Sequence, residues 1–126
     1  MYEEKDISKL LDSLAKSKFR SSFHLNGKMK AYTRDKGYEK IESDAYDFIK
    51  KRIADAEPKN DGKQTPMRAN SHPVFIAQHA TGLCCRGCAL RIHGIEKGKE
   101  LNDRQIDYCV KVIMTWIKRE MEDDNA

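Results

Sequence analysis

A long amphipathic helix is predicted near the C-terminal end of the chain, where apolar residues recur at steps of three and four. Its main stripe is Ile106, Val110, Ile113, Met114, Ile117 and Met121. Tyr108, Val112 and Trp116 widen the stripe, so we expect this helix to pack against neighbours on two sides. Asn102 and Gln105 stand at its start with the spacing of a reciprocal capping pair.

Shorter stretches with the same periodicity predict further helices, most of them delimited by a capping residue, a glycine or a proline. We expect them near residues 7–17, 26–36, 38–55, 72–82 and 84–94. The run Val74–Ile76 is also compatible with a short buried strand, because periodicity alone cannot classify so short an apolar run. Phe19 and Phe23 are expected to anchor the connection after the first helix onto the core.

These elements predict a mainly α fold, a compact single-domain helical bundle of about five to six helices over residues 1–126. A chain of 126 residues is long enough for one modest core, and its 39% hydrophobic and 35% charged residues are typical of a soluble globular domain. Residues 1–5 are expected to form a loose start and residues 122–126 a loose acidic end. No apolar run approaches the ~20 residues of a membrane span.

The strongest chemical signal is the stretch of 22 residues from His72 to His93. It holds three of the four cysteines and three of the four histidines. Cys85 and Cys88 form a C-x-x-C step, a spacing that lets two sulfurs converge on one ion in a tight turn. His79 and His93 flank the cysteines and supply the imidazole nitrogens that zinc also accepts. We therefore predict one metal site between two short helices, with His79, Cys85, Cys88 and His93 as the best set of four ligands.

Cys84 and His72 are alternate ligands in this prediction. Neighbouring side chains diverge on a helix, so one of Cys84 and Cys85 is expected to bind the metal and the other to pack. Zinc is the favoured ion, with an iron–sulfur cluster as the less favoured cofactor. The spacing is neither that of a standard zinc finger nor that of a zinc deaminase. The alternatives to a metal site are plain packing of the cysteines or a reactive thiolate at a helix N-terminus near Arg86.

Basic residues gather between Lys16 and Lys40, where eight of them face two acidic residues, although the net charge of the chain is only +4. This segment predicts contacts with the phosphates of DNA or RNA, with an ordinary solvated face as the alternative. A polar loop at residues 59–68 precedes the cysteine stretch and is interpreted as a binding loop, with a plain surface loop as the alternative. Its candidate binding residues are Lys59, Asn60, Asp61, Lys63, Gln64 and Arg68.

The first 20 residues carry four acidic side chains and no continuous apolar stretch, so a secretory signal is not expected. A cytoplasmic location follows, together with the absence of a membrane partner. In a reducing compartment, metal ligation or a free thiol is favoured over a disulfide. Cys109, which lies apart from the other cysteines on the apolar side of the last helix, is interpreted as a small buried hydrophobe.

The polar loop and the cysteine stretch resemble an uncharacterised bacterial and phage domain family, the domain-of-unknown-function family numbered 4186. The motifs that carry the resemblance are Pro58–Arg68, His72–Thr81, Cys84–Cys88 and His93–Ile95. The similarity extends from Lys18–Ser21 to Trp116–Ile117, which is most of the chain. It implies membership of a group and no particular activity.

Three functions are compatible with this sequence. The favoured one is a small metal-stabilised helical module that binds nucleic acid through the basic segment and the polar loop. The second is a metal-dependent, hydrolase-type enzyme in which an open metal position activates water. The third is a structural or interaction protein whose metal ion only stabilises a small core.

Overall fold

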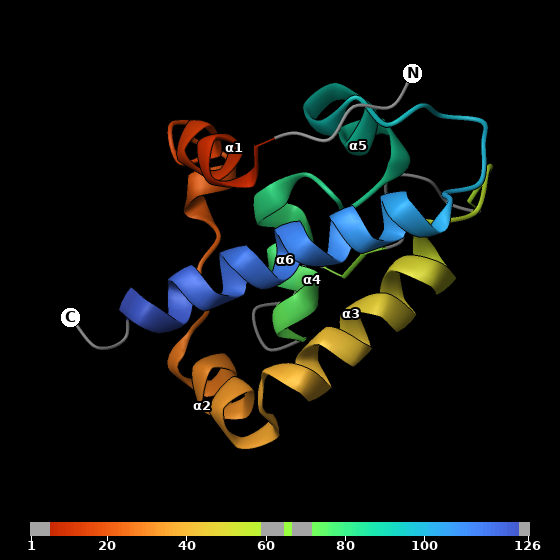
Figure 1. Ribbon diagram of the computed structural model, residues 1–126. Coiled ribbons are helices and arrows are strands. Elements are labelled where there is room, and N and C mark those ends of the chain that lie inside the picture. Colours follow the sequence, from red (N-terminus) through yellow and green to blue (C-terminus); the bar gives the residue numbers. More distant parts are fainter. Residues whose placement is uncertain (1–5, 59–64, 67–71, 124–126) are drawn as a thin grey trace.

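The computed structural model describes residues 6–58, 65–66 and 72–123. Within these ranges the chain forms six α-helices and one short 3₁₀ helix, η1, and it contains no strand. The elements are α1 (Ile7–Leu14), η1 (Arg20–Ser22), α2 (Gly27–Lys36), α3 (Tyr38–Arg52), α4 (Pro73–Thr81), α5 (Arg86–His93) and α6 (Asp103–Asp123). The predicted mainly α class is thereby confirmed (Figure 1).

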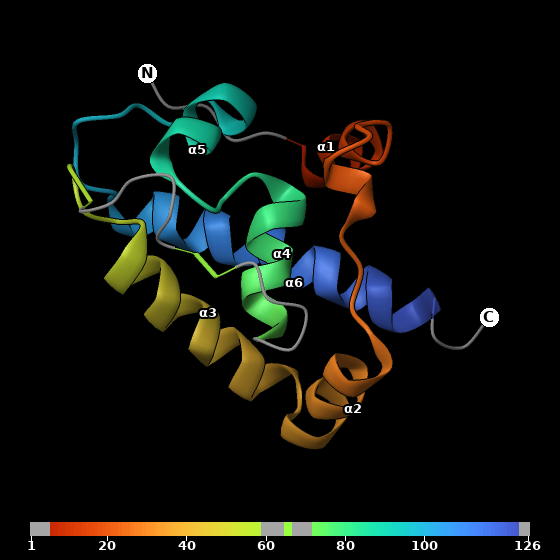
Figure 2. The same cartoon turned by 180° about the vertical axis from the view of Figure 1, so that it is seen from behind.

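Helix α6 is the central element, and it packs against both α3 and α4. It crosses in front of α4 in Figure 1, and the reverse view in Figure 2 shows α4 in front of it. The predicted two-sided packing of α6 is confirmed, because Tyr108 and Val112 are as deeply buried as Ile113 and Ile117. The core therefore lies between α3, α4 and α6, and the smaller helices surround it.

Local signals in the sequence set most helix boundaries. Asp6 accepts a hydrogen bond from the backbone N–H of Lys9 and so caps α1. Asn102 and Gln105 exchange the two bonds of a capping box, with N···O distances of 3.0 and 2.8 Å. Helix α3 ends at Arg52, three residues earlier than predicted, and α6 continues to Asp123, into the end that was predicted to be loose. Residues 1–5 and 124–126 lie outside the described ranges.

The helix predicted near residues 72–82 is confirmed as α4, and the strand alternative for Val74–Ile76 is excluded, because His72 caps this helix and Pro73 occupies its first turn. One local prediction needs correction. Phe19 does not anchor the chain on the core, since 53% of its surface is exposed, whereas Phe23 does pack against the core.

The corner between α4 and α5 requires a glycine. Gly82 has φ +78°, in the left-handed region, and a Cβ atom at this position would lie 2.3 Å from Cδ1 of Ile92. The corner therefore combines a turn that only glycine adopts readily with a close approach of the α5 side chain. It directs the chain from α4 into the cysteine segment.

Candidate metal centre

Three cysteine sulfurs meet at the corner between α4 and α5. The Sγ atoms of Cys84, Cys85 and Cys88 all lie within 4.8 Å of one another, and all three side chains are buried. No other histidine, cysteine, aspartate or glutamate of the described residues belongs to this group. The arrangement therefore offers three thiolate ligands at one point.

The backbone of Cys85 explains why two adjacent cysteines both face Cys88. The sequence pattern allowed α5 to begin at Cys84 or Cys85, and side chains that follow each other on a helix diverge. In the structure α5 begins at Arg86, and Cys85 is its extended N-cap residue, with φ −159° and ψ 168°. Its sulfur accepts the backbone N–H of Cys88 at 3.3 Å, in the place of a capping side chain. Cys84, predicted as an alternate, thus stands beside Cys85 as an equal member of the group.

Two arginine side chains surround the sulfurs. Nη2 of Arg20 lies 3.3 Å from the sulfur of Cys88, and its Nη1 lies 3.8 Å from the sulfur of Cys84. Nη2 of Arg91 lies 3.2 Å from the sulfur of Cys88. Arg20 is held in place by a hydrogen bond from Nη1 to the carbonyl of His79 at 2.5 Å. Cys88 is therefore the sulfur at which the two guanidinium groups meet.

These surroundings push the pKa values of two cysteines apart. Burial, with the repulsion of Cys88 next, raises the pKa of Cys84 to about 12. Burial also acts to raise the pKa of Cys88, but hydrogen bonds from Arg20 and the neighbouring cysteines outweigh it and hold that pKa below the usual value. Of these two thiols, Cys88 is therefore the one that loses its proton first, while Cys84 keeps its proton.

Arg86, which the sequence placed near a possible reactive thiolate, is bound to backbone carbonyls in the structure. It is 1% exposed, and its guanidinium donates to four backbone carbonyls, those of Ile53, Asp55, Glu96 and Lys99. These carbonyls belong to the end of α3 and to the segment after α5. Arg86 thus ties the start of α5 to two other parts of the chain and fixes the position of the cysteine corner.

His79 lies next to the centre but is engaged elsewhere. Its Nε2 donates to the carbonyls of Thr65 and Pro66, both at 3.1 Å, and its ring stacks on Phe23 with centroids 5.5 Å apart. Burial holds the pKa of His79 below its usual value. The hydroxyl of Thr65 in turn donates to the carbonyl of Cys84 at 2.8 Å. His79 therefore supports the cysteine corner through Thr65.

The other two predicted histidine ligands are also placed in hydrogen bonds. Nε2 of His93 donates to the carbonyl of Thr81 at 2.7 Å, so its Nδ1 accepts from the hydroxyl of Tyr108, also at 2.7 Å. Nδ1 of His72 accepts the backbone N–H of Val74, and its Nε2 donates to Asp44 at 2.9 Å. Both histidines would have to give up these bonds to reach an ion. The structure brings together the three cysteines and not the histidines, whose role as ligands stays a prediction.

A family model, the Domain of unknown function (DUF4186), matches residues 8–118, which is most of the chain. The chain belongs to the DUF4186 family. The match contains the three cysteines together with Arg20 and Arg91, so the whole centre lies inside the family's domain. No solved structure matches the chain.

The basic segment of this DUF4186 domain divides into two kinds of residue. Arg20 is directed to the cysteines, and Lys40 pairs with Asp44 at 2.8 Å, so neither presents an uncommitted charge. Lys28, Arg34 and Lys36 on α2 are exposed. Nucleic-acid binding by the segment stays a prediction. Among the helices that the structure describes, none has the length and apolar character to cross a membrane.

The predicted polar binding loop falls largely outside the described residues. Its candidate residues Lys59, Asn60, Asp61, Lys63, Gln64 and Arg68 all lie there. Thr65 is described, and it contacts the cysteine corner through its hydroxyl and its carbonyl. Thr65 was expected to supply hydrogen bonds in this loop, but its contact with the cysteine corner was not predicted, because a threonine in a polar stretch gives no signal of what it contacts.

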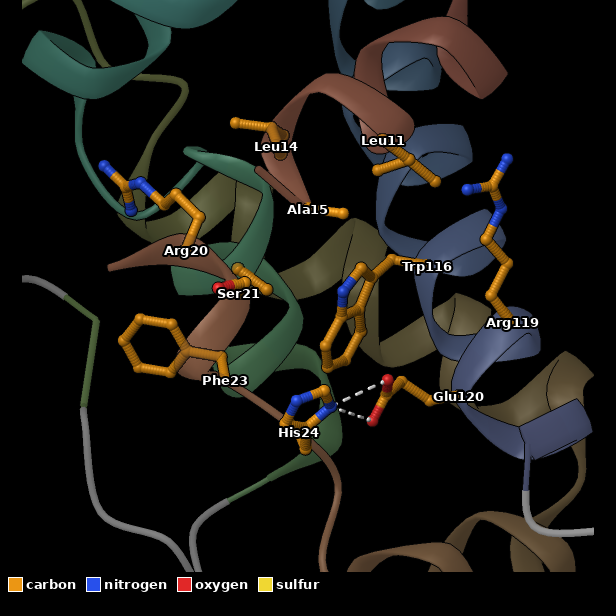
Figure 3. A pocket seen from close by; sticks show the side chains of 11 residues that line it. Leu11, Leu14, Ala15, Arg20, Ser21, Phe23, His24, Trp116, Arg119 and Glu120 are labelled. Atoms are coloured by element: carbon orange, nitrogen blue, oxygen red, sulfur yellow. Dashed lines mark hydrogen bonds and ion pairs between the residues drawn. The ribbon is translucent and has the colours of Figure 1, made fainter. Parts of the chain in front are cut away.

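A pocket of about 220 Å³ is lined by residues of α1, α6 and the segment around η1, and it shares Arg20 with the centre. Figure 3 shows Trp116, Leu11 and Leu14 along it, with the guanidinium of Arg20 pointing away from Trp116 and His24. At its rim, Nδ1 of His24 lies 3.1 Å from Glu120, whose other oxygen accepts the backbone N–H of Leu25. These polar groups satisfy one another, so the pocket by itself indicates no ligand.

Proposed function

We propose that this DUF4186 domain binds one transition-metal ion, zinc by the chemistry of its ligands, through Cys84, Cys85 and Cys88. The observation that carries the proposal is the mutual approach of the three sulfurs to within 4.8 Å. Sulfurs bound to one tetrahedral zinc ion lie roughly 3.8 Å apart, because each Zn–S bond is about 2.3 Å long. The sulfurs would thus need to close by only about 1 Å around the ion.

The type of ligand favours zinc. Thiolates select zinc, copper(I) or iron–sulfur iron, whereas magnesium and calcium require oxygen ligands. Iron–sulfur clusters of the common types use four protein ligands, and the described residues group only three. Zinc sites with three protein ligands leave the fourth position to another ligand.

The two arginines offset the cost of burying a charged metal centre in this fold. Three thiolates around a divalent ion carry one net negative charge, which is costly to remove from water unless it is paired. Arg20 and Arg91 lie at hydrogen-bond distance from the sulfurs and offset that charge. Metal ligands in proteins are usually held by hydrogen bonds from neighbouring groups, and the two arginines are placed to act in this way.

Elemental analysis of protein purified without added metal tests the proposal. We expect about one zinc ion per chain, and loss of most of it in Cys85→Ser and in Cys88→Ser. Cys109→Ala is the matched control, since Cys109 is fully buried in the core, and it should retain the metal. In protein substituted with cobalt(II), the intensity of the sulfur-to-cobalt charge-transfer absorption gives the number of thiolate ligands. A metal content that is unaffected by both serine variants would exclude this centre as the binding site.

A second candidate function is thiol chemistry at Cys88. It is favoured by the two guanidinium groups at 3.3 and 3.2 Å from that sulfur, which stabilise the nucleophilic thiolate form. We then expect iodoacetamide to alkylate Cys88 in metal-free protein faster than Cys84, whose pKa is about 12. Mass spectrometry of the modified peptide measures both rates. Equal and slow alkylation of both cysteines would exclude a reactive Cys88.

A further inference from the structure

The three sulfurs leave one position of a tetrahedral ion for a ligand from outside the group. The described residues contain no other histidine, cysteine, aspartate or glutamate close enough to join them. This inference rests on the proposed metal site and concerns only what completes it. The question is which chemical class of ligand the surroundings of the centre favour.

The charges around the centre favour an anion. A divalent ion with three thiolates has a net charge of −1, and the guanidinium groups of Arg20 and Arg91 add two positive charges. The centre with its two arginines therefore has one positive charge in excess. A neutral ligand such as water leaves that excess in place, whereas a singly charged anion cancels it.

The shape of the two guanidinium groups narrows the class further. Both groups meet at the sulfur of Cys88, at 3.3 and 3.2 Å. A ligand that completed the ion beside Cys88 would therefore lie near the guanidinium N–H groups that the sulfurs and the carbonyl of His79 leave unused. Guanidinium presents a planar fork of donors that matches carboxylate and phosphate. Such an oxyanion can bind the ion with one oxygen and a guanidinium with a second, which a ligand with a single donor atom cannot do.

A ligand from solvent could approach the fourth position on the side of Arg91. Arg91 is an exposed residue near the end of α5, and Arg20 comes from η1 on another part of the chain. The two arginines thus reach Cys88 from different elements, and one of them remains open to solvent. We infer that the fourth ligand of this centre is an oxyanion, a carboxylate or phosphate group, held between the metal ion and the guanidinium groups of Arg20 and Arg91.

Cobalt(II)-substituted full-length protein provides the test, because visible absorption of cobalt reports a change of ligand. Sodium acetate and inorganic phosphate are titrated separately at constant ionic strength, and 2-mercaptoethanol serves as a ligand with a single donor atom. We expect a saturable spectral change with at least one oxyanion. Its affinity should be about tenfold weaker in Arg91→Met, because a partly exposed charge contact of this kind contributes about that factor. Arg91→Lys should restore only part of it, because lysine keeps the charge but not the fork of donors.

Lys51→Met is the control, since it removes the same charge from an exposed position on α3 and should change the affinity less than about twofold. Cobalt binding with no response to either oxyanion would overturn the inference, as would equal affinities in wild type and Arg91→Met. A response to 2-mercaptoethanol alone would also overturn it and assign a thiolate instead. Failure of cobalt to bind would overturn the metal site itself, so the two proposals fail separately.

Discussion

Arg86 is predicted to be the residue on which the shape of the cysteine corner depends most. Its side chain is 1% exposed and donates to four carbonyls at 2.5–3.3 Å, from the end of α3 and from the segment after α5. The perturbation is Arg86→Met, which keeps the helix propensity and much of the apolar stem while removing every donor.

The expected loss follows from the burial of those carbonyls. A hydrogen bond from a charged donor stabilises a fold by about 1.5–3 kcal/mol. Only the bond to Ile53 is fully buried, and the other three are partly buried, so water can replace part of them in the variant. We therefore expect Arg86→Met to lower the free energy of unfolding by about 3–5 kcal/mol, well below the sum of four such bonds.

Urea denaturation followed by circular dichroism measures this loss, with the metal content recorded on the same samples. Arg91→Met is the matched control on the same helix, and it should cost less than about 1 kcal/mol because Arg91 is exposed. Arg86→Lys keeps the charge but not the fork of donors, so an intermediate loss of about 2 kcal/mol is expected and keeps the test open if Arg86→Met does not fold. Equal unfolding midpoints for Arg86→Met and Arg91→Met would refute the reasoning.

Three further predictions concern the corner, its protons and the basic helix. Because the pKa of Cys84 is about 12, its proton must leave when metal binds. The release of this proton should raise the apparent metal affinity about tenfold per pH unit between pH 6 and 8. Competition with a chelator measures this affinity, and equal values at pH 6 and pH 8 would contradict the prediction. Gly82→Ala should lower the free energy of unfolding by about 2–4 kcal/mol, from the clash with Ile92 and the positive φ, while Gly27→Ala, which meets nothing within 4 Å, should cost nothing in the same urea titration. If α2 binds nucleic acid, the double variant Lys28→Glu, Lys36→Glu should reduce the slope of log affinity against log salt concentration by about 1.4 on single-stranded DNA. Fluorescence anisotropy measures this slope, and an unchanged slope would argue against binding through α2.

The helices could be predicted because their signals are local. The cap of α1 by Asp6, the capping box of Asn102 and Gln105, and the apolar stripe of α6 all act within a few residues, and each is present in the structure. The first residue of α5 could not be predicted, because a local pattern does not fix a helix boundary to a single residue. One residue of backbone at Cys85 decides whether Cys84 and Cys85 diverge or face the same point, and the sequence allowed α5 to begin on either of them.

The centre itself could be predicted only in part. The clustering of cysteines pointed to the corner where the three sulfurs meet, but ligand spacing cannot show which histidines already have other partners. His93 is committed to Tyr108 and Thr81, and these contacts depend on the packing of α5 against the rest of the fold. Arg20 gave no signal at all, because it lies 64 and 68 residues before the sulfurs that it contacts. Contacts of such sequence separation are set by the tertiary fold, which local pattern does not encode.

The separation between the sulfurs and Arg20 has a thermodynamic consequence. The three cysteines lie within five residues, so an unfolded chain already carries them together and can hold a metal ion weakly. The contact with Arg20 exists only after folding, and it is one source of any additional affinity in the native state. By linkage, the ratio of metal affinities in the native and unfolded chains equals the factor by which the ion shifts the folding equilibrium. A peptide covering residues 82–94, compared with the whole chain, would therefore measure in a binding experiment how much a bound ion stabilises this fold.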